Sequence, residues 1–173
     1  MTITAPTKTD RTYNGSAQTI FAAGSCTTGG TMYYSDTNKT FSTSTWSTSL
    51  PYTQKTDYGT YTIYYYCYVS DTANNTGSNI NAIKSVSATI NRGTRSGAVS
   101  CNNVTYGSTI TATVSVNPTN WTGGTVTWGI TNGTGTATIN SSGVVTPTKV
   151  GTVTVTATVG ASGNYAGYTA TSK

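Results

Sequence analysis

The most regular pattern in the chain is found in one stretch, Asp57-Tyr58-Gly59-Thr60-Tyr61-Thr62-Ile63-Tyr64-Tyr65-Tyr66-Cys67-Tyr68-Val69. One set of alternate positions holds Tyr61, Ile63, Tyr65, Cys67 and Val69, and the other holds Thr62, Tyr64, Tyr66 and Tyr68. Successive side chains of a strand point to opposite faces, so this period of two predicts a strand with one buried face. We expect the strand to cover residues 60–69, with a turn before it and further strands around it.

Composition favours strands throughout the chain. Its 173 residues include 42 threonines and 13 tyrosines, and only 8% of them are charged. Threonine, tyrosine and valine fit the pleated surface of a sheet better than a helix. We therefore predict an all-β fold whose solvent faces are built from Thr, Ser and Asn rather than from charges.

The stretches on either side of the main pattern are shorter and more polar. We expect a loose polar lead at residues 3–14, strands at 19–23 and 31–34, and edge strands or a long connection at 35–50 that carries Phe41 and Trp46. Residues 85–90 alternate again and predict a closing strand. In the second half, alternation predicts strands at residues 110–116, 126–130 and 152–159, with a last strand at 165–171.

The second half repeats signals of the first. Gly59-Thr60-Tyr61-Thr62-Ile63 is echoed by Gly151-Thr152-Val153-Thr154-Val155, at an offset of 92 residues. Two further pairs of short motifs follow at similar offsets, which indicates tandem domains of one topology. The polar, glycine-containing run 91–97 is typical of a linker. We predict two β-sandwich domains, at residues 1–93 and 97–173.

A family resemblance covers roughly residues 100–172. Thr125-Val126-Thr127-Trp128, then Asn140-Ser141-Ser142-Gly143-Val144-Val145, then Gly151-Thr152-Val153-Thr154-Val155 resemble, in order, the bacterial immunoglobulin-like (Ig-like) group 2 domain. Residues 10–91 are similar, less closely, to other bacterial Ig-like repeats. The resemblance implies tandem Ig-like sandwiches with Trp128 and Tyr61 buried, and it implies a scaffold role rather than a chemistry.

The resemblance also assigns structural roles around the main pattern. Asp57, Gly59 and Tyr61 resemble the corner before strand F of an Ig-like sandwich, where the tyrosine hydroxyl bonds to backbone upstream. Cys26 and Cys67 would lie near the same pole of such a sandwich, which allows a disulfide between its sheets. Reduced, packed thiols are the alternative, and Cys101 stays unpaired in both cases.

Aromatic side chains supply the candidate binding residues. Tyr64, Tyr66 and Tyr68, on the face opposite the core, are candidates for stacking on a glycan or docking a protein partner, and so is Trp121. The alternative is ordinary cross-strand pairing with Tyr33 and its neighbours. Oxygen atoms of Asp71, Asn74 and Asn75 could bind Ca²⁺, although turns use these residues for backbone reasons.

Residue types for catalysis are scarce. The chain has no His and no Glu, and its four carboxylates are Asp10, Asp36, Asp57 and Asp71. A general acid–base pair or a Ser-His-Asp arrangement lacks its parts, and the three cysteines lack metal-site spacing. The nine Lys and Arg are scattered, so nucleic-acid binding is not expected. We predict a non-enzymatic protein without cofactors or metals.

Context suggests where such a protein works. Met1 leads directly into polar sequence without a secretion signal, and no apolar run is long enough for membrane insertion. Phage proteins leave the cell by lysis and need no signal, so we expect a virion-surface accessory protein, a capsid decoration or head-fibre component. Its expected partners are capsid or other virion proteins, another copy of itself, or a host-surface glycan. The alternatives are a fragment of an adhesin at the bacterial cell surface and a carbohydrate-binding module.

Overall fold

Strands make up all the regular structure in the part of the chain that the structure describes. The computed structural model describes residues 2–26, 29–70, 82–119 and 124–172, and these contain no helix, which confirms the all-β prediction. The described residues therefore offer no helix long and apolar enough to cross a membrane. Two compact units divide the chain, unit 1 at Met1–Asn91 and unit 2 at Arg92–Lys173. This division falls at the start of the linker expected at residues 91–97.

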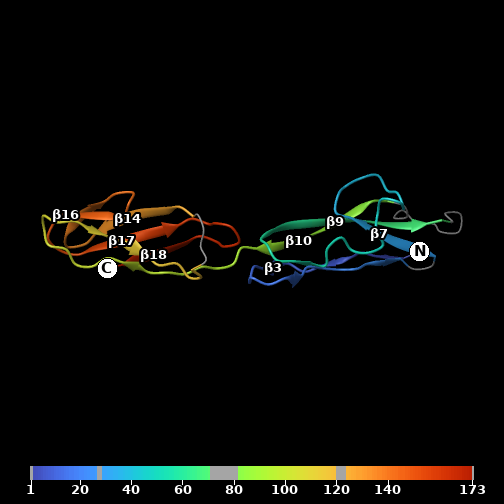
Figure 1. Ribbon diagram of the computed structural model, residues 1–173, viewed down its shortest axis with the longest axis horizontal. Coiled ribbons are helices and arrows are strands. Elements are labelled where there is room, and N and C mark those ends of the chain that lie inside the picture. The colour runs from blue at the N-terminus through green and yellow to red at the C-terminus, as the bar shows by residue number, and fades with distance from the viewer. Residues whose placement is uncertain (1, 27–28, 71–81, 120–123, 173) are drawn as a thin grey trace. The chain divides into compact units, whose positions relative to one another are not determined.

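Unit 1 is built from two layers (Figure 1). Its described strands are β1 (Ile3–Thr4), β2 (Thr7–Lys8), β3 (Arg11–Thr12), β4 (Gln18–Thr19), β5 (Phe21–Ala22), β6 (Ser25–Cys26), β7 (Gly30–Ser35), β8 (Gln54–Lys55), β9 (Gly59–Val69) and β10 (Lys84–Asn91). One layer is the sheet β3-β10-β9-β7, in which β3 runs parallel to β10 and the other pairs are antiparallel. The second layer consists of the pairs β1-β6, β2-β5 and β4-β8.

Residues 3–14 are not the loose lead that the sequence suggested. β1 pairs with β6, β2 pairs with β5, and β3 joins the edge of the main sheet beside β10. Each of these pieces is two residues long, so none is long enough to display a period of two. Pairing with distant strands, rather than local pattern, makes them extended.

The core of unit 1 lies between the layers and holds large side chains. The inward face of β9 supplies Ile63, Tyr65, Cys67 and Val69, all buried as the alternation predicted. From the opposite layer come Ile20 and Phe21, which are 0% and 2% exposed. Buried Tyr34 of β7 fixes the two layers to each other, because its hydroxyl donates to the Gly24 carbonyl and accepts from the Gly24 N–H.

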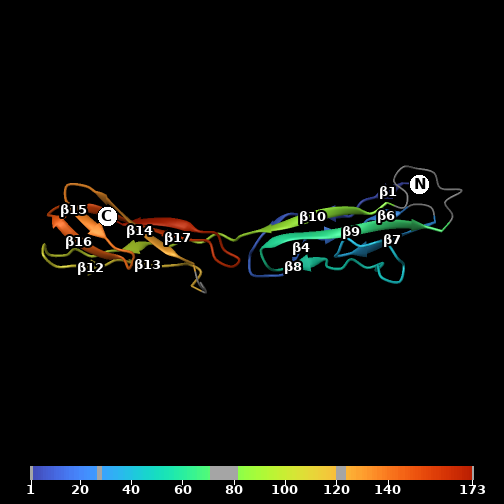
Figure 2. The ribbon, with the colours of Figure 1, turned by 90° about the horizontal axis from the view of Figure 1, so that it is seen from above.

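Unit 2 places two three-stranded sheets around its own core. Its described strands are β11 (Val99–Ser100), β12 (Ile110–Thr111), β13 (Thr113–Val114), β14 (Val126–Asn132), β15 (Thr136–Ile139), β16 (Val144–Lys149), β17 (Val153–Val159) and β18 (Tyr168–Ser172). The sheets are β14-β17-β18 and β12-β16-β15, with the pair β11-β13 beside them. Figure 2 shows β14 next to β17 and β12 next to β16. The buried cluster consists only of Ala and Val.

Neutral hydroxyl groups link neighbouring strands on the outer faces. In unit 1, Thr62 Oγ1 lies 2.8 Å from Ser87 Oγ, across β9 and β10. In unit 2, Thr136 Oγ1 lies 2.6 Å from Thr148 Oγ1, across β15 and β16. Hydroxyl pairs of this kind add stabilisation to a sheet without introducing charge.

Candidate functional site: an aromatic face on unit 1

The outer side of the main sheet of unit 1 carries a cluster of rings. Tyr66 and Tyr68 of β9 point away from the core, and Tyr33 of β7 lies directly opposite Tyr66 in the antiparallel register. Phe41 and Trp46 join them from the connection that follows β7. We call these five side chains the aromatic face.

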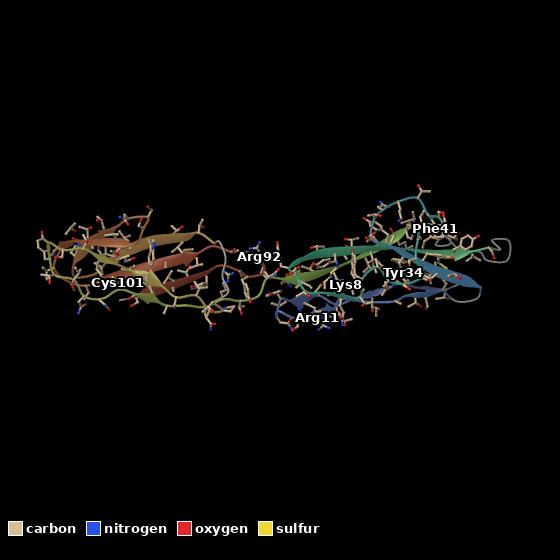
Figure 3. All side chains as sticks on the ribbon, in the orientation of Figure 1. Lys8, Arg11, Tyr34, Phe41, Arg92 and Cys101 are labelled. Atoms are coloured by element: carbon tan, nitrogen blue, oxygen red, sulfur yellow. A yellow bond between two sulfur atoms is a disulfide. The ribbon has the colours of Figure 1, made fainter. Side chains whose placement is uncertain are left out.

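Phe41 is at the centre of the aromatic face. Its ring stacks on Tyr66, with centroids 3.8 Å apart and planes 11° apart, and it also lies 5.6 Å from Tyr68. Tyr33 and Trp46 meet it edge-on at 5.4 Å and 5.7 Å. These are favourable geometries for aromatic pairs. Figure 3 labels Phe41 on the connection and Tyr34 on β7.

The connection itself is tied to the sheet edge. Backbone hydrogen bonds link Tyr34 of β7 with Ser47, at 2.7 Å and 3.0 Å. Trp46 is 4% exposed, and its indole N–H donates to the Thr40 carbonyl at 3.2 Å. The sequence predicted neither this cover nor its contacts, but one signal was present: a lone Phe and a lone Trp in an otherwise polar stretch.

The tyrosines predicted as candidates differ in what they offer a partner. Tyr68 is 38% exposed, whereas Tyr66 is partly buried beneath Phe41. Burial raises the pKa of the Tyr66 hydroxyl, and Tyr68 beside it raises that pKa further. Tyr64 lies opposite Ser35, and its ring takes no part in the stacking seen in the described residues. The aromatic face itself consists of stacked and edge-on rings, which suits it to apolar and ring contacts.

Asp57, Gly59 and Tyr61 form a corner at the start of β9. The Tyr61 hydroxyl donates to the Asp57 carbonyl at 2.7 Å, and Gly59 between them has a φ of 155°. The Tyr61 ring contacts Tyr52 edge-on at 5.9 Å. Tyr61 is only partly buried, because its hydroxyl reaches the backbone of the corner at the surface. The expectation that Tyr61 is fully buried was therefore wrong.

Trp128 is also only partly buried, contrary to expectation. It lies on β14, at the edge of its sheet, and packs against the core cluster of unit 2 from one side. The turn Asn140–Gly143 covers part of the ring. Gly143 has a φ of 79°, and a Cβ built there would lie 2.9 Å from the Trp128 ring. Only glycine fits this approach.

Cys26 and Cys67 form a disulfide that joins the two layers of unit 1. Their Cα atoms lie 6.2 Å apart, and Cys26 ends β6 while Cys67 lies near the end of β9. Cys101, in unit 2, is a free thiol. Burial raises the pKa of that thiol.

Comparison with known proteins gave no assignment. No protein-family model, curated protein or solved structure matches the chain. The resemblance of residues 100–172 to the bacterial Ig-like group 2 domain therefore stays a prediction.

The remaining candidates lie outside the described residues or have structural roles. Trp121 lies outside the part of the chain that the structure describes, and so do Asp71, Asn74 and Asn75. Within that part, no three His, Cys, Asp or Glu side chains group as a metal site would require. Asp10 has a structural role: it accepts from Lys8 Nζ at 2.6 Å and from the Thr89 N–H of β10 at 2.8 Å. These two bonds hold the pKa of Asp10 below its usual range.

Proposed function

We propose that this chain is a non-enzymatic structural and display protein made of two tandem Ig-like sandwiches. The strand order supports the fold assignment. In unit 1, β10-β9-β7 has the order of the G-F-C sheet of an Ig domain, and the Cys26–Cys67 disulfide occupies the place of the B–F bridge. The Tyr61–Asp57 hydrogen bond has the form of the tyrosine corner. In unit 2, β14-β17-β18 supplies the matching sheet.

The aromatic face is the observation that carries the display role. Tyr68 is exposed beside stacked rings, and aromatic side chains are enriched in protein interfaces and among the residues that contribute most to their binding energy. We place the protein on the surface of a phage virion, as a capsid decoration or head-fibre component. The bacterial Ig-like resemblance supports this setting, and a bacterial cell-surface adhesin is the rival reading of the same resemblance.

A carbohydrate-binding module is less well supported by the same geometry. A sugar ring would stack on the open face of an aromatic side chain, but Phe41 already covers Tyr66 at 3.8 Å. Of the candidates Tyr64, Tyr66 and Tyr68, which the structure describes, Tyr68 is the most exposed. The contact we propose is therefore with protein.

Mass spectrometry of purified virions tests the location. Phage particles from the host that carries this gene are separated from cell debris on a density gradient, and peptides of the chain are quantified in each fraction. We expect them to comigrate with the capsid proteins. Their recovery in the bacterial cell-surface fraction, as part of a longer polypeptide, would replace the virion assignment by the adhesin.

Binding variants test the aromatic face separately. Phe41→Ser and Tyr68→Ser should each lower the occupancy of the protein on particles at least tenfold, since interface aromatics commonly contribute about 2 kcal/mol or more. Tyr58→Ser, at a tyrosine that is 46% exposed and outside the aromatic face, is the matched control. Equal occupancy of all three folded variants would rule out this surface.

A further inference from the structure

Unit 2 contains a cavity of about 270 Å³ that reaches its core. One wall comes from Ile110, Ala137 and Val145, and the opposite wall from Val153 and Val155 of β17. The segment 101–104 and Tyr106 form part of the remaining boundary. The cavity is larger than an engineered apolar cavity of about 150 Å³ that binds benzene.

The corresponding place in unit 1 is filled by aromatic rings. Gly151-Thr152-Val153 repeats Gly59-Thr60-Tyr61, both glycines have positive φ, and β17 and β9 hold the same central position in their sheets. Tyr61 packs beside Tyr52 against the Ile20 and Phe21 cluster. Val153, which replaces that tyrosine in unit 2, instead lines the cavity.

A lysine accompanies the site in both units. Lys55 Nζ lies 4.3 Å from the Tyr52 ring centroid and 5.2 Å from that of Tyr61. Lys149, two residues before Gly151, is part of the cavity lining. A lysine ammonium within about 6 Å of a ring centroid attracts the face of that ring, as Lys55 does in unit 1.

The mouth of the cavity carries two exposed hydrophobic side chains among polar ones such as Asn102 and Asn103. Tyr106 and Val150 belong to the lining and are 60% and 77% exposed, the highest values among the large hydrophobic side chains that the structure describes. Exposed apolar groups at the edge of a concave apolar site are typical of a binding position.

We propose that this cavity binds a single neutral aromatic ring about the size of a tyrosine side chain. The ring would regain the packing contacts that Tyr61 provides in unit 1 and that Val153 leaves unmade. Such a ring could reach the site as a free small molecule or as a side chain of another polypeptide. This binding site is independent of the aromatic face on unit 1 and of the display role.

Cys101 supplies a direct readout, because its free thiol lines the cavity while Cys26 and Cys67 are bonded to each other. The full chain is mixed with p-cresol, the tyrosine side-chain analogue, and the rate of Cys101 alkylation is measured at fixed pH. At a p-cresol concentration ten times its Kd, that rate should fall about tenfold, since about one site in eleven stays empty. Backbone amide NMR signals of Ala137 and Val153 should shift in the same titration.

Two probes distinguish the sources of the ring. N-acetyltyrosine amide carries the same ring on a peptide backbone, and tighter binding than p-cresol would assign the site to a polypeptide side chain. Tighter binding of p-cresol would assign it to a free aromatic molecule. Both results support the ring site. Unchanged alkylation and unchanged NMR signals with both probes, up to their solubility limits, would overturn it.

Variants show whether the ring binds where we place it. Val153→Tyr restores the residue of unit 1, and should abolish protection of Cys101 by p-cresol because the cavity is already filled. Ala137→Leu fills the opposite wall and gives the same test if Val153→Tyr does not fold. Thr127→Tyr adds the same ring at an exposed position of β14, outside the lining, and should leave protection unchanged. Full protection in a folded cavity-filling variant would place the probe elsewhere and contradict the proposal.

Discussion

Unit 1 and unit 2 use similar strand pairings around cores of different size. Four of the five largest fully buried side chains, Phe21, Ile20, Ile63 and Ile90, belong to unit 1. Only Val159 comes from unit 2, whose buried cluster is Ala and Val. A repeated strand pattern therefore fixes the arrangement of the backbone but not the volume of the interior, and a cavity remains where the smaller side chains lie.

The corners at the start of β9 and just before β17 are also closed by side chains of different size. In unit 1 an aromatic hydroxyl closes the corner, through the Tyr61 bond to Asp57. In unit 2 a threonine does so, because Thr134 Oγ1 accepts from the Thr152 N–H at 3.0 Å. A Cβ at Gly151 would collide with the backbone of Thr134 and Gly135, so this tighter corner requires glycine.

Removal of the disulfide should give the largest difference between the units. Cys26→Ala with Cys67→Ala opens a link across 41 residues, and unit 1 should lose about 3–4 kcal/mol of unfolding free energy. Unit 2 should be unaffected. Urea denaturation followed at Trp46 for unit 1 and at Trp128 for unit 2 measures both, with Cys101→Ser as the control. Equal losses in the two transitions would mean that the units unfold as one.

Truncation of equivalent core positions should sharpen the contrast in packing. Ile63→Ala, at a residue with no exposure, should cost about 3–4 kcal/mol because it opens a new cavity in a filled core. Val155→Ala, at the matching position of unit 2, should cost about 2 kcal/mol, since it removes fewer atoms beside an existing cavity. Equal costs by urea denaturation would indicate that the two cores are equally well packed.

Tyr61→Phe isolates the corner hydrogen bond. The ring stays in place, so unit 1 should lose only about 1 kcal/mol, the usual net contribution of one hydrogen bond. Tyr106→Phe, at an exposed tyrosine of unit 2, provides the comparison. If Tyr61→Phe lowers the unfolding free energy of unit 1 no more than Tyr106→Phe lowers that of unit 2, the corner hydrogen bond does not stabilise unit 1.

Low pH should destabilise unit 1 but not unit 2, and this difference should be the smallest of the four. The pKa of Asp10 is lowered in the folded state by Lys8 and by the Thr89 N–H, so its contribution is present above its unfolded pKa and is lost as pH falls through the folded pKa. Unit 2 has no Asp or Glu side chain. Unit 1 should therefore lose stability below about pH 4 while unit 2 does not, and Asp10→Asn should reduce the loss. Thermal unfolding at pH 2.5 and pH 6 measures this.

The sequence predicted the regular parts of this fold because those parts are encoded locally. The alternation of Ile63, Tyr65, Cys67 and Val69 is long enough to define a buried face, and burial follows it. β1, β2 and β3 were missed because two-residue strands have no period, and their partners are distant in sequence.

The sequence predicted the tyrosines of the candidate site but not the side chains that cover them. Alternation placed Tyr66 and Tyr68 on the outer face, but no local signal says that a connection will fold back over them and stack Phe41 there. The cavity of unit 2 was missed as well. The cavity arises because Val153 is smaller than Tyr61, which holds the equivalent position in unit 1. Valine and tyrosine both fit the alternating strand pattern, so the pattern does not reveal the difference in size.

Hydroxyl pairs such as Thr62–Ser87 and Thr136–Thr148 join the outer faces of both units without charge. Dissolved ions weaken attractions between exposed charges separated by more than about 10 Å at 0.1 M salt, but they do not screen a hydrogen bond between two neutral hydroxyls. Since only 8% of the residues are charged, these sheets should hold together equally well in dilute buffer and in concentrated sodium chloride.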